Sequence, residues 1–347
     1  MNQAHDMGGW SIREEASLAA HNTMRVAARA RWLIELHDAT RLPEVLSQPA
    51  IRSAPLLVLG QGSNVLFAGD FPGTVLVIAT RGVTLEEDSD AVHMAVAAGE
   101  CWDDFVRWSL AQGHPGLENL VLIPGLVGAA PMQNIGAYGV EVARFIESVE
   151  TWDRESAAPA VLSAGECAFG YRDSRFKREP DRHVITGVRF CLPRRHELQL
   201  GYAGLEQELR RMGVAQPGAF HVAEAVVRLR TRKLPDPAVI GNAGSFFKNP
   251  LIEASAAAAL VAEHPQMPHW PDPDGPTKLS AAWMIESCGF KGLREGDAGI
   301  SNRHALVLVN HGSATGVQLW NLAQQVIAGV QQRFGVELEP EPRIIGG

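Results

Sequence analysis

The stretch from Gly116 to Val142 is the feature that most limits how this chain can fold. It contains five glycines, two prolines and a run of three small residues, Gly128-Ala129-Ala130. Such a segment has no run long enough for a helix and no alternation of apolar and polar residues for a strand. Its backbone N–H groups need other partners, because unpaired donors are costly where they are buried. Glycine-rich loops let main-chain donors approach phosphate oxygens closely, so the sequence predicts that this loop holds a pyrophosphate.

A second glycine-rich loop, Gly60-Gln61-Gly62-Ser63-Asn64, follows the apolar run from Leu56 to Leu59. In the first loop, the amide side chains of Gln133 and Asn134 stand among glycines. Amides placed in this way suit recognition of the polar edge of a ring. The alternative is a pair of ordinary surface turns, and the amides favour a bound ligand instead.

Composition limits the partners of the chain. At 347 residues with 46% hydrophobic content, it is long enough to bury two or three cores. A net charge of −8 and a pI near 5.9 argue against a nucleic-acid or anionic-membrane partner. The small basic cluster of Arg172, Arg175, Lys177 and Arg178 suits an anionic small molecule better. The first thirty residues carry charges throughout and hold no apolar segment of the signal-peptide kind, so we expect a cytoplasmic protein.

Several common site types are not supported by the sequence. The four cysteines are far apart and form no C-x-x-C pair, which indicates buried free thiols. The histidines show no H-E-x-x-H spacing, so no metal site is expected. The chain also lacks a P-loop and a G-x-S-x-G nucleophile elbow, and the turn at Gly60 lacks the third glycine of a Rossmann fingerprint.

The hydrophobic pattern predicts a mixed chain of helices and strands after a polar N-terminal lead. Strands are expected at 54–60, 74–80, 91–98, 142–152, 183–192, 305–309 and 336–345. Helices are expected at 101–112, 221–234, 253–263, 278–288 and 315–335, and a helix or helix-like connection at 26–37. Residues 193–212 are expected to be a mobile insert or a short helix. The last helix is the clearest, because Thr315 can cap it and Gly335 can end it.

Three polar positions are candidates for a chemical role. Tyr171-Arg172 supplies a phenol and a fixed cation, Ser245 is flanked by glycine and aromatic residues, and Glu341 lies in a Leu-Glu-Pro-Glu-Pro-Arg run. Glu339, in the same run, is a close competitor for any role given to Glu341.

Five motifs, in one order, resemble the UDP-N-acetylenolpyruvoylglucosamine reductases (MurB). They are Gly60–Phe67, Ile123–Gly139, Gly170–Ser174, Gly241–Pro250 and Leu338–Glu341. The resemblance extends from about residue 20 to residue 346, and the surroundings of Tyr202 resemble the type I branch of the family. Two places depart from the family pattern. Asn22-Thr23-Met24-Arg25 replaces the usual Asn-Thr-Phe-Gly opening, and residues 263–276 match no motif of the family that we can assign.

The resemblance implies an α+β fold: an FAD-binding domain of the vanillyl-alcohol-oxidase or p-cresol-methylhydroxylase type, followed by a smaller α+β substrate-binding domain. The expected bounds are 19–196 for the FAD domain with its two subdomains, 197–220 for an insert or linker, and 221–347 for the C-terminal domain. It also implies non-covalent FAD, NADPH as co-substrate and a small-molecule partner, UDP-N-acetylglucosamine enolpyruvate. A monomer with no nucleic-acid, membrane or metal partner is expected.

The resemblance also implies roles for individual residues. The catalytic ones are Arg172, Ser245 and Glu341, with hydride passing from N5 of reduced FAD to C3 of the substrate and a proton from Ser245 to C2. The expected cofactor-binding residues are Gly60, Gly62, Ser63, Asn64, Pro124, Gly125, Gly128, Gln133, Asn134, Gly136, Tyr138 and Gly139. The expected substrate-binding residues are Tyr171, Tyr202, Lys233, Asn249 and His304. Two alternatives stay open: another flavin oxidoreductase on the same domain type, and a nucleotide-sugar sensor without catalysis.

Overall fold

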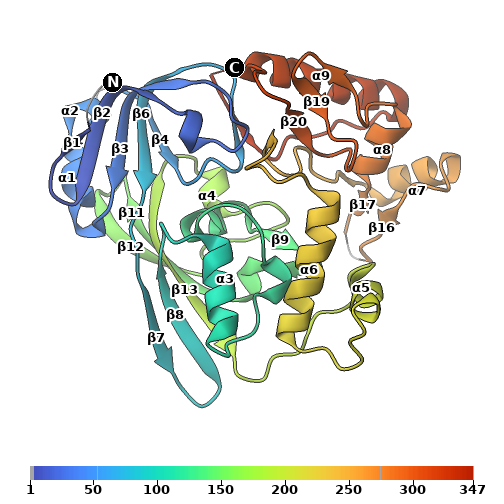
Figure 1. Ribbon diagram of the computed structural model, residues 1–347, viewed down its shortest axis with the longest axis horizontal. Coiled ribbons are helices and arrows are strands. Elements are labelled where there is room, and N and C mark those ends of the chain that lie inside the picture. Colours follow the sequence, from blue (N-terminus) through green and yellow to red (C-terminus); the bar gives the residue numbers. More distant parts are fainter. Residues whose placement is uncertain (1–3, 53, 274, 347) are drawn as a thin grey trace. The chain divides into compact units, whose positions relative to one another are not determined.

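The computed structural model describes residues 4–52, 54–273 and 275–346 of the chain (Figure 1). The chain forms two compact units. The first contains the residues up to Ala16, Ala30–Gly62 and Phe71–Thr231, and the second contains Ser17–Arg29, Ser63–Asp70 and the chain from Arg232 onward. Among the described helices, none combines the length and the apolar character needed to cross a membrane.

The first unit contains a five-stranded sheet with the order β1-β2-β3-β6-β4. The strands are β1 (His5–Asp6), β2 (Trp10–Ser17), β3 (Arg29–Leu36), β6 (Phe71–Ile78) and β4 (Leu56–Leu59). β6 pairs in parallel with both β3 and β4. The short helices α1 (Leu42–Ser47) and α2 (Pro49–Arg52) connect β3 to β4. The strands expected at 54–60 and 74–80 are therefore confirmed.

The expectation of a helix at 26–37 was wrong, because β3 occupies most of that range. From Asn22 to Arg31 every second residue is buried and the residues between are half-buried or exposed, which is the period of a strand. Alanines in this stretch favour a helix when they are considered alone. The polar N-terminal lead was also underestimated, because it contains β2, whose Trp10 is 1% exposed.

A second five-stranded sheet of the first unit has the order β12-β11-β13-β8-β7, and all its neighbouring strands are antiparallel. The strands are β12 (Ala158–Ser163), β11 (Ile146–Asp153), β13 (His183–Pro193), β8 (Ala91–Ala97) and β7 (Val83–Glu87). Figure 1 shows them side by side, although they come from distant parts of the sequence. The expected strands at 91–98, 142–152 and 183–192 are confirmed.

Helix α3 (Trp102–Ala111) packs on the apolar core of this unit through its apolar side, which includes Phe105 and Leu110. The ring of Phe105 lies 5.2 Å from that of Phe190 on β13, centroid to centroid. The buried indole of Trp102 donates to the carbonyl of Leu120 at 2.9 Å, so its one polar atom is satisfied. The rest of the unit contains α4 (Arg175–Arg178), α5 (Leu205–Arg211) and most of α6 (Ala219–Lys233). The segment 193–212 thus contains a short helix.

The second unit is built around α9 (Gly316–Phe334), with Thr315 and Gln318 forming a capping box and Gly335 ending the helix at a φ of 68°. Three small sheets accompany it. The first has the order β14 (Gly241–Asn242), β20 (Leu308–Asn310), β19 (Ala298–Ile300) and β18 (Arg294–Glu295), and the second has the order β15 (Leu251–Ile252), β17 (Thr277–Leu279) and β16 (His269–Trp270). In the third, β21 (Arg343–Ile345) runs parallel to β5 (Val65–Phe67). Helices α7 (Ala254–Glu263) and α8 (Ala281–Ser287) complete the unit.

Two strand expectations in the second unit were only partly right. The strand expected at 305–309 begins later, at Leu308, and the one expected at 336–345 is limited to Arg343–Ile345. Arg25, which stands where the family opening has glycine, adopts a φ of 56°, in the left-handed region that glycine favours.

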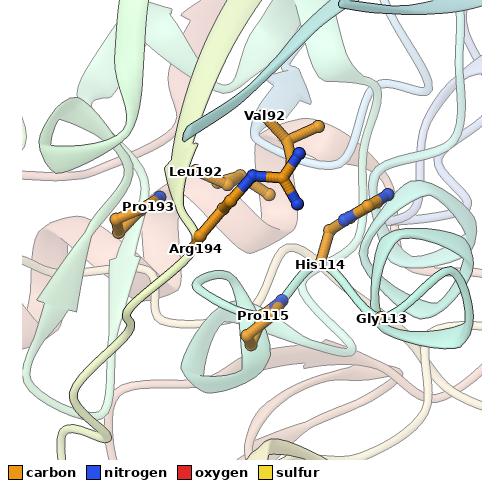
Figure 2. A pocket seen from close by; sticks show the side chains of 7 residues that line it. All are labelled: Val92, Gly113, His114, Pro115, Leu192, Pro193 and Arg194. Atoms are coloured by element: carbon orange, nitrogen blue, oxygen red, sulfur yellow. The ribbon is translucent and has the colours of Figure 1, made fainter. Parts of the chain in front are cut away.

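Figure 2 shows a surface hollow of the first unit, just before the start of the glycine-rich loop in the sequence. It is lined by Val92, Gly113, His114, Pro115, Leu192, Pro193 and Arg194. The guanidinium of Arg194 donates to Glu87 at 2.6 Å and to the carbonyl of Asp88 at 2.7 Å. The guanidinium of Arg194 is thus held in place by groups of the chain itself.

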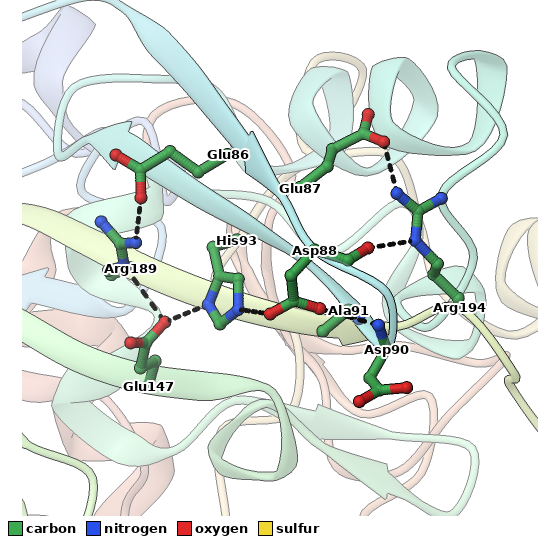
Figure 3. A network of polar contacts seen from close by, with 9 residues as sticks. All are labelled: Glu86, Glu87, Asp88, Asp90, Ala91, His93, Glu147, Arg189 and Arg194. Atoms are coloured by element: carbon green, nitrogen blue, oxygen red, sulfur yellow. Dashed lines mark hydrogen bonds and ion pairs between the residues drawn. The ribbon is translucent and has the colours of Figure 1, made fainter.

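The outer face of the β7, β8, β11 and β13 sheet carries a network of charged side chains (Figure 3). His93 Nδ1 lies 2.7 Å from Glu147, and His93 Nε2 lies 3.3 Å from Asp88. Arg189 donates to Glu147 at 3.1 Å and to Glu86 at 2.6 Å. Glu147 above all, and Asp88 with it, raise the pKa of His93 above its ordinary value of 6.5.

This network makes a pH-dependent contribution to stability. Because the folded pKa of His93 is raised, its contribution is complete below the unfolded value and is lost as the pH rises through the folded pKa. We expect His93→Gln to lower the free energy of unfolding by at most about 1 kcal/mol near pH 6, since the pair is a surface one. Urea unfolding at about pH 6 and about pH 9 checks this, because the loss should shrink at the higher pH. A loss that is equal at both values would contradict it.

Candidate active site

The glycine-rich loop Gly116–Val142 is held against the turn between β8 and α3. The N–H of Trp102 donates to the carbonyl of Gly125 at 3.0 Å, and the N–H of Gly128 donates to that of Ala98 at 2.9 Å. Gly128 has no room for a side chain, because a Cβ there would lie 2.5 Å from the Cβ of Ala98. As expected, the loop contains only short elements: 3-10 turns at Glu118–Leu120, Val127–Ala129 and Pro131–Gln133, and the hairpin of β9 (Gly136–Ala137) and β10 (Val140–Glu141).

Several buried polar atoms of the first unit fit a large polar cofactor. Thr80 Oγ1, Asn119 Oδ1 and Arg230 Nε are buried and have no hydrogen-bond partner among the described residues. Folded proteins seldom leave such atoms unpaired. A ligand with both donors and acceptors, such as FAD with its isoalloxazine ring and diphosphate, would satisfy them. Gly62, at a φ of 64°, and Gly125, at 126°, supply the turns that such an approach needs.

Arg230 is a residue that the sequence analysis missed. It lies on α6 beside the buried Val226 and Leu229. Burial lowers its pKa, whereas the nearby Tyr138 and Asp103 raise it. No local signal marks it, because Arg228, Arg230 and Arg232 look alike in the sequence, and only the packing of α6 leaves Arg230 less exposed than the other two.

The residues expected to bind the cofactor fall in both units. The members from Pro124 to Gly139 belong to the first unit together with Gly60 and Gly62, whereas Ser63 and Asn64 belong to the second. In the second unit, the carbonyl of Asn64 accepts from the N–H of Arg343 at 3.1 Å, and its side-chain amide reaches the carbonyl of Glu341 at 3.4 Å. Asn64 therefore helps to place the segment that carries Glu341.

Asn134 has a structural role inside the loop. Its amide donates to Glu141 at 2.8 Å and to the carbonyl of Gly170 at 3.0 Å, and its oxygen accepts from the N–H of Ala143 at 3.0 Å. Asn134 itself has a φ of 44° and ends the last 3-10 turn. These bonds connect the glycine-rich loop to the turn that carries Arg172.

Arg172 lies at the tip of a tight turn. The backbones of Gly170 and Asp173 exchange two hydrogen bonds, at 3.0 and 3.2 Å, which leaves Tyr171 and Arg172 at the tip. Arg172 has a φ of 52°, a conformation that side chains other than glycine rarely adopt and that concentrates at functional sites. Its Nη2 donates to the carbonyl of Gly136 at 2.7 Å. The orientation of the guanidinium is therefore fixed by the β9–β10 hairpin of the glycine-rich loop.

Two tyrosines expected at different ligands meet in the first unit. The rings of Tyr138 and Tyr202 are 4.8 Å apart, centroid to centroid, and inclined by 63°. Tyr138 is buried and Tyr202 is exposed. The guanidinium of Arg172 lies 5.5 Å from the centre of the Tyr171 ring, so these two neighbours are in contact as well.

In the second unit, the strand-like segments around Ser245 and Glu341 pair with each other. The N–H of Glu341 donates to the carbonyl of Phe246 at 2.8 Å, and the N–H of Lys248 donates to that of Glu339 at 3.0 Å. Gly244, at a φ of 69°, turns the chain immediately before Ser245. Phe246 is 1% exposed and anchors the segment in the core. The structure thus brings together Ser245 and Glu341, which are far apart in the sequence.

The environments of Glu339 and Glu341 differ. The side chain of Glu339 is 65% exposed and forms an ion pair with Lys248. Glu341 is half-buried, on the segment that pairs with Phe246. A carboxylate shielded from solvent acts more strongly on a bound ligand than an exposed one. The geometry therefore favours Glu341 over Glu339 for a chemical role.

His304 and Lys233 lie near each other in the second unit. Burial lowers the pKa of His304, and the charge of Lys233 lowers it further. Nδ1 of His304 accepts from the N–H of Leu306 at 3.3 Å, so its neutral ring carries the proton on Nε2. The carbonyl of Leu306 in turn accepts from the N–H of Phe246 at 2.7 Å, which connects this loop to the Ser245 segment.

Asn249 caps a helix in addition to any role at a ligand. Its Oδ1 accepts from the N–H of Ala281, the first residue of α8, at 3.0 Å. Asn249 thus holds the start of α8 close to the Gly241–Pro250 motif.

Comparison with known proteins agrees with this architecture. Residues 30–156 match the family of FAD binding domains, and residues 236–345 match the C-terminal domain of UDP-N-acetylenolpyruvoylglucosamine reductase. The solved structure of UDP-N-acetylenolpyruvylglucosamine reductase (MurB) from Thermus caldophilus superposes with a TM-score of 0.66 at 25% identity, covering 99% of this chain and 100% of that one. The α+β fold class, with an FAD-binding domain followed by the C-terminal domain of this family, is therefore confirmed.

Similarity in sequence extends over almost the whole chain. UDP-N-acetylenolpyruvoylglucosamine reductases of Xanthomonas euvesicatoria pv. vesicatoria and Xanthomonas campestris pv. campestris (strain B100) are 54% and 56% identical, and in each case 97% of both chains is covered. The one from Xylella fastidiosa (strain M12) is 52% identical with the same coverage. Identity at this level over this length means that the chain belongs to the UDP-N-acetylenolpyruvoylglucosamine reductase family.

Proposed function

We propose that this chain reduces UDP-N-acetylglucosamine enolpyruvate to UDP-N-acetylmuramate with NADPH and FAD, in the synthesis of peptidoglycan precursors. Family membership over 97% of the chain is the observation that carries the proposal. The pairing of the Ser245 and Glu341 segments, and the fixed guanidinium of Arg172, supply groups that this chemistry needs.

FAD, when bound, supplies hydride transfer between NADPH and the enolpyruvyl group. The two glycine-rich loops would hold it, through the backbone from Pro124 to Gly139 and from Gly60 to Asn64. Arg230 and Asn119 would contribute the buried polar atoms that the protein itself leaves unpaired. Their unsatisfied donor and acceptor suit the edge of a flavin or its diphosphate.

Arg172 would neutralise the charge that develops on the substrate carboxylate. A guanidinium pairs with a carboxylate through two parallel N–H donors. Because Nη2 of Arg172 is already held by Gly136, the group does not have to be reoriented during the reaction. Glu341 would help to polarise and orient the same carboxylate.

Ser245 would deliver the proton to C2. A serine hydroxyl is a weak acid, but a carbon that bears enolate charge is basic enough to take its proton. Gly244 before it and Phe246 after it fix the path of the backbone at Ser245. Lys248, three positions on, or water would restore the proton.

Five residues are proposed to bind the nucleotide sugar. Lys233 would neutralise part of the diphosphate, His304 would donate from Nε2, and Asn249 would hydrogen-bond the sugar. Tyr202 would stack on or bond to the nucleotide, and Tyr171 would contact the enolpyruvyl end. The partner is thus a small anionic molecule. We also retain as proposals a cytoplasmic monomer and the absence of a nucleic-acid partner.

The absorption spectrum of the purified protein tests the function. NADPH should bleach the flavin band, and UDP-N-acetylglucosamine enolpyruvate should then restore it under anaerobic conditions. UDP-N-acetylglucosamine, which lacks the enolpyruvyl group, is the matched control and should leave the flavin reduced. Reoxidation by neither compound would indicate another flavin oxidoreductase, and binding of the sugar without any flavin change would indicate a sensor.

We expect the FAD to be bound without a covalent link. Flavins are attached through histidine in several relatives of this domain type, and no histidine lies between Pro115 and Phe169. Cys167, the one cysteine in that range, is buried, and burial raises the pKa of its thiol to about 12, which makes it a poor nucleophile. Acid precipitation should release the yellow cofactor into the supernatant. Flavin that remains in the pellet would show a covalent bond.

A further inference from the structure

A buried pair of side chains connects the glycine-rich loop to the segment between β13 and α5. His196 Nε2 lies 2.5 Å from Glu118 Oε1, and the two side chains are 3% and 0% exposed. The second carboxylate oxygen of Glu118 accepts from the N–H of Gly116 at 2.7 Å. A buried carboxylate that loses its partner is strongly destabilised, so the pair holds the 196 region at one position along the loop.

A second side chain repeats this connection. The amide nitrogen of Asn119 donates both to the carbonyl of Tyr138 and to the carbonyl of Gln199, each at 2.9 Å. Leu198 and Leu200, on either side of Gln199, pack against the apolar core of the first unit. The position of this segment along the loop is therefore set by two hydrogen bonds, from His196 to Glu118 and from Asn119 to Gln199.

The segment leads directly to Tyr202. Its ring touches that of Tyr138, 4.8 Å away, and Tyr138 is the residue whose carbonyl Asn119 holds. Tyr138, at a φ of 50°, is kept in an unusual backbone conformation. One network thus places both a tyrosine proposed to contact the flavin and a tyrosine proposed to contact the nucleotide sugar.

We propose that Glu118 and His196 are positioning residues for the substrate: the pair, which touches no ligand, holds the 196–202 segment so that Tyr202 meets the nucleotide part of UDP-N-acetylglucosamine enolpyruvate. This inference rests on the proposed function. A hydrogen-bonded buried pair sets a position more narrowly than apolar packing, because its strength depends on distance and direction. Its loss would weaken substrate binding far more than it would affect the chemical steps.

The test is a comparison of His196→Ala with His93→Ala. His93 forms a similar pair with Glu147, at 2.7 Å, on the outer face of the sheet in the same unit (Figure 3). We expect His196→Ala to raise the KM for the enolpyruvyl substrate by about tenfold or more, in line with the cost of a displaced contact. kcat, and flavin reduction by saturating NADPH, should stay close to wild-type. His196→Gln, which keeps a donor near the same place, should recover much of the KM, and His93→Ala should leave it unchanged.

The rate of limited trypsin digestion provides a second measurement, which does not depend on enzyme activity. Arg194 and Arg195 are exposed just before His196, so cleavage there should be faster in His196→Ala than in His93→Ala. An unchanged KM with unchanged cleavage would overturn the proposal. The proposal would also be overturned if His196→Ala lowered kcat and thermal stability as strongly as it raised KM, and His196→Gln recovered none of these. A merely structural pair predicts that pattern. A wild-type enzyme that the enolpyruvyl substrate fails to reoxidise would instead refute the proposed function, and the cleavage comparison would still decide whether the pair holds the segment.

Discussion

Ser245→Ala should leave flavin reduction by NADPH nearly unchanged and slow reoxidation by the enolpyruvyl substrate about 10²- to 10⁴-fold, the range usual for a positioned acid. The hydroxyl is the group that would protonate C2, whereas the backbone bonds around it, from Phe246 to Leu306 and Glu341, do not involve the side chain. Stopped-flow absorbance at the flavin band, run separately for the two half-reactions, measures both rates.

Two further serine variants sharpen this test. Ser245→Cys keeps a transferable proton and should recover part of the loss. Ser280 is the matched control, because its hydroxyl caps α8 in the same unit by accepting from the N–H of Trp283 at 3.2 Å. Ser280→Ala should lower stability by about 1 kcal/mol, as loss of a cap does, and leave both half-reactions intact. If Ser245→Ala behaves like Ser280→Ala, the proton comes from water or another residue.

Arg172→Lys should lower kcat/KM about 10²- to 10³-fold, as does removal of one donor aimed at developing negative charge. The guanidinium can hold the carbonyl of Gly136 with one arm and present its remaining N–H groups to a carboxylate. The ammonium group of lysine lacks this planar fork, so it cannot hold the Gly136 carbonyl and also bind a carboxylate through two parallel N–H groups. Single-turnover reoxidation of the reduced enzyme measures the effect on the chemical step.

Arg178→Lys is the control for the turn that carries Arg172. Arg178 forms an ion pair with Asp173 and donates to the carbonyl of Ala168 at 2.8 Å, so it supports the same turn from its exposed side. Its replacement should leave activity close to wild-type, because surface pairs contribute little. Equal losses in both variants would mean that the turn, and not the guanidinium of Arg172, is what the reaction requires.

Elements whose signals lie within a few residues could be predicted from the sequence. Helix α9 has its cap at Thr315, its apolar stripe and its terminal Gly335 within one continuous segment. Strands β8 and β13 alternate over their own length. β3 shows the limit of this approach, since buried and exposed residues alternate up to its start, whereas Ala27, Ala28 and Ala30 favour a helix. Local preference is weak compared with the pairing that a sheet supplies.

The sequence predicted which residues belong to the candidate site better than it predicted the contacts that hold them in place. The order of motifs pointed to Arg172, Ser245 and Glu341, and their roles remain predictions for the experiments above. The sequence did not point to Arg230, because one arginine beside an apolar stripe looks like a surface residue until the helix is placed. It also did not point to Glu118 and His196, which are 78 positions apart.

The sequence by itself determined that Gly116–Val142 forms no long helix or strand, because glycines, prolines and small residues interrupt any regular pattern there. That this loop and Gly60–Asn64 bind a ligand remains a prediction. The sequence also determined the family, through five motifs in one order. Only the tertiary structure decided that the Phe246 backbone pairs with that of Glu341, that Glu339 is occupied by Lys248, and that Asn119 joins Tyr138 to Gln199. The physical reason is range: propensity and periodicity act over neighbouring residues, whereas these contacts join segments that only the packing of the whole unit brings within hydrogen-bonding distance.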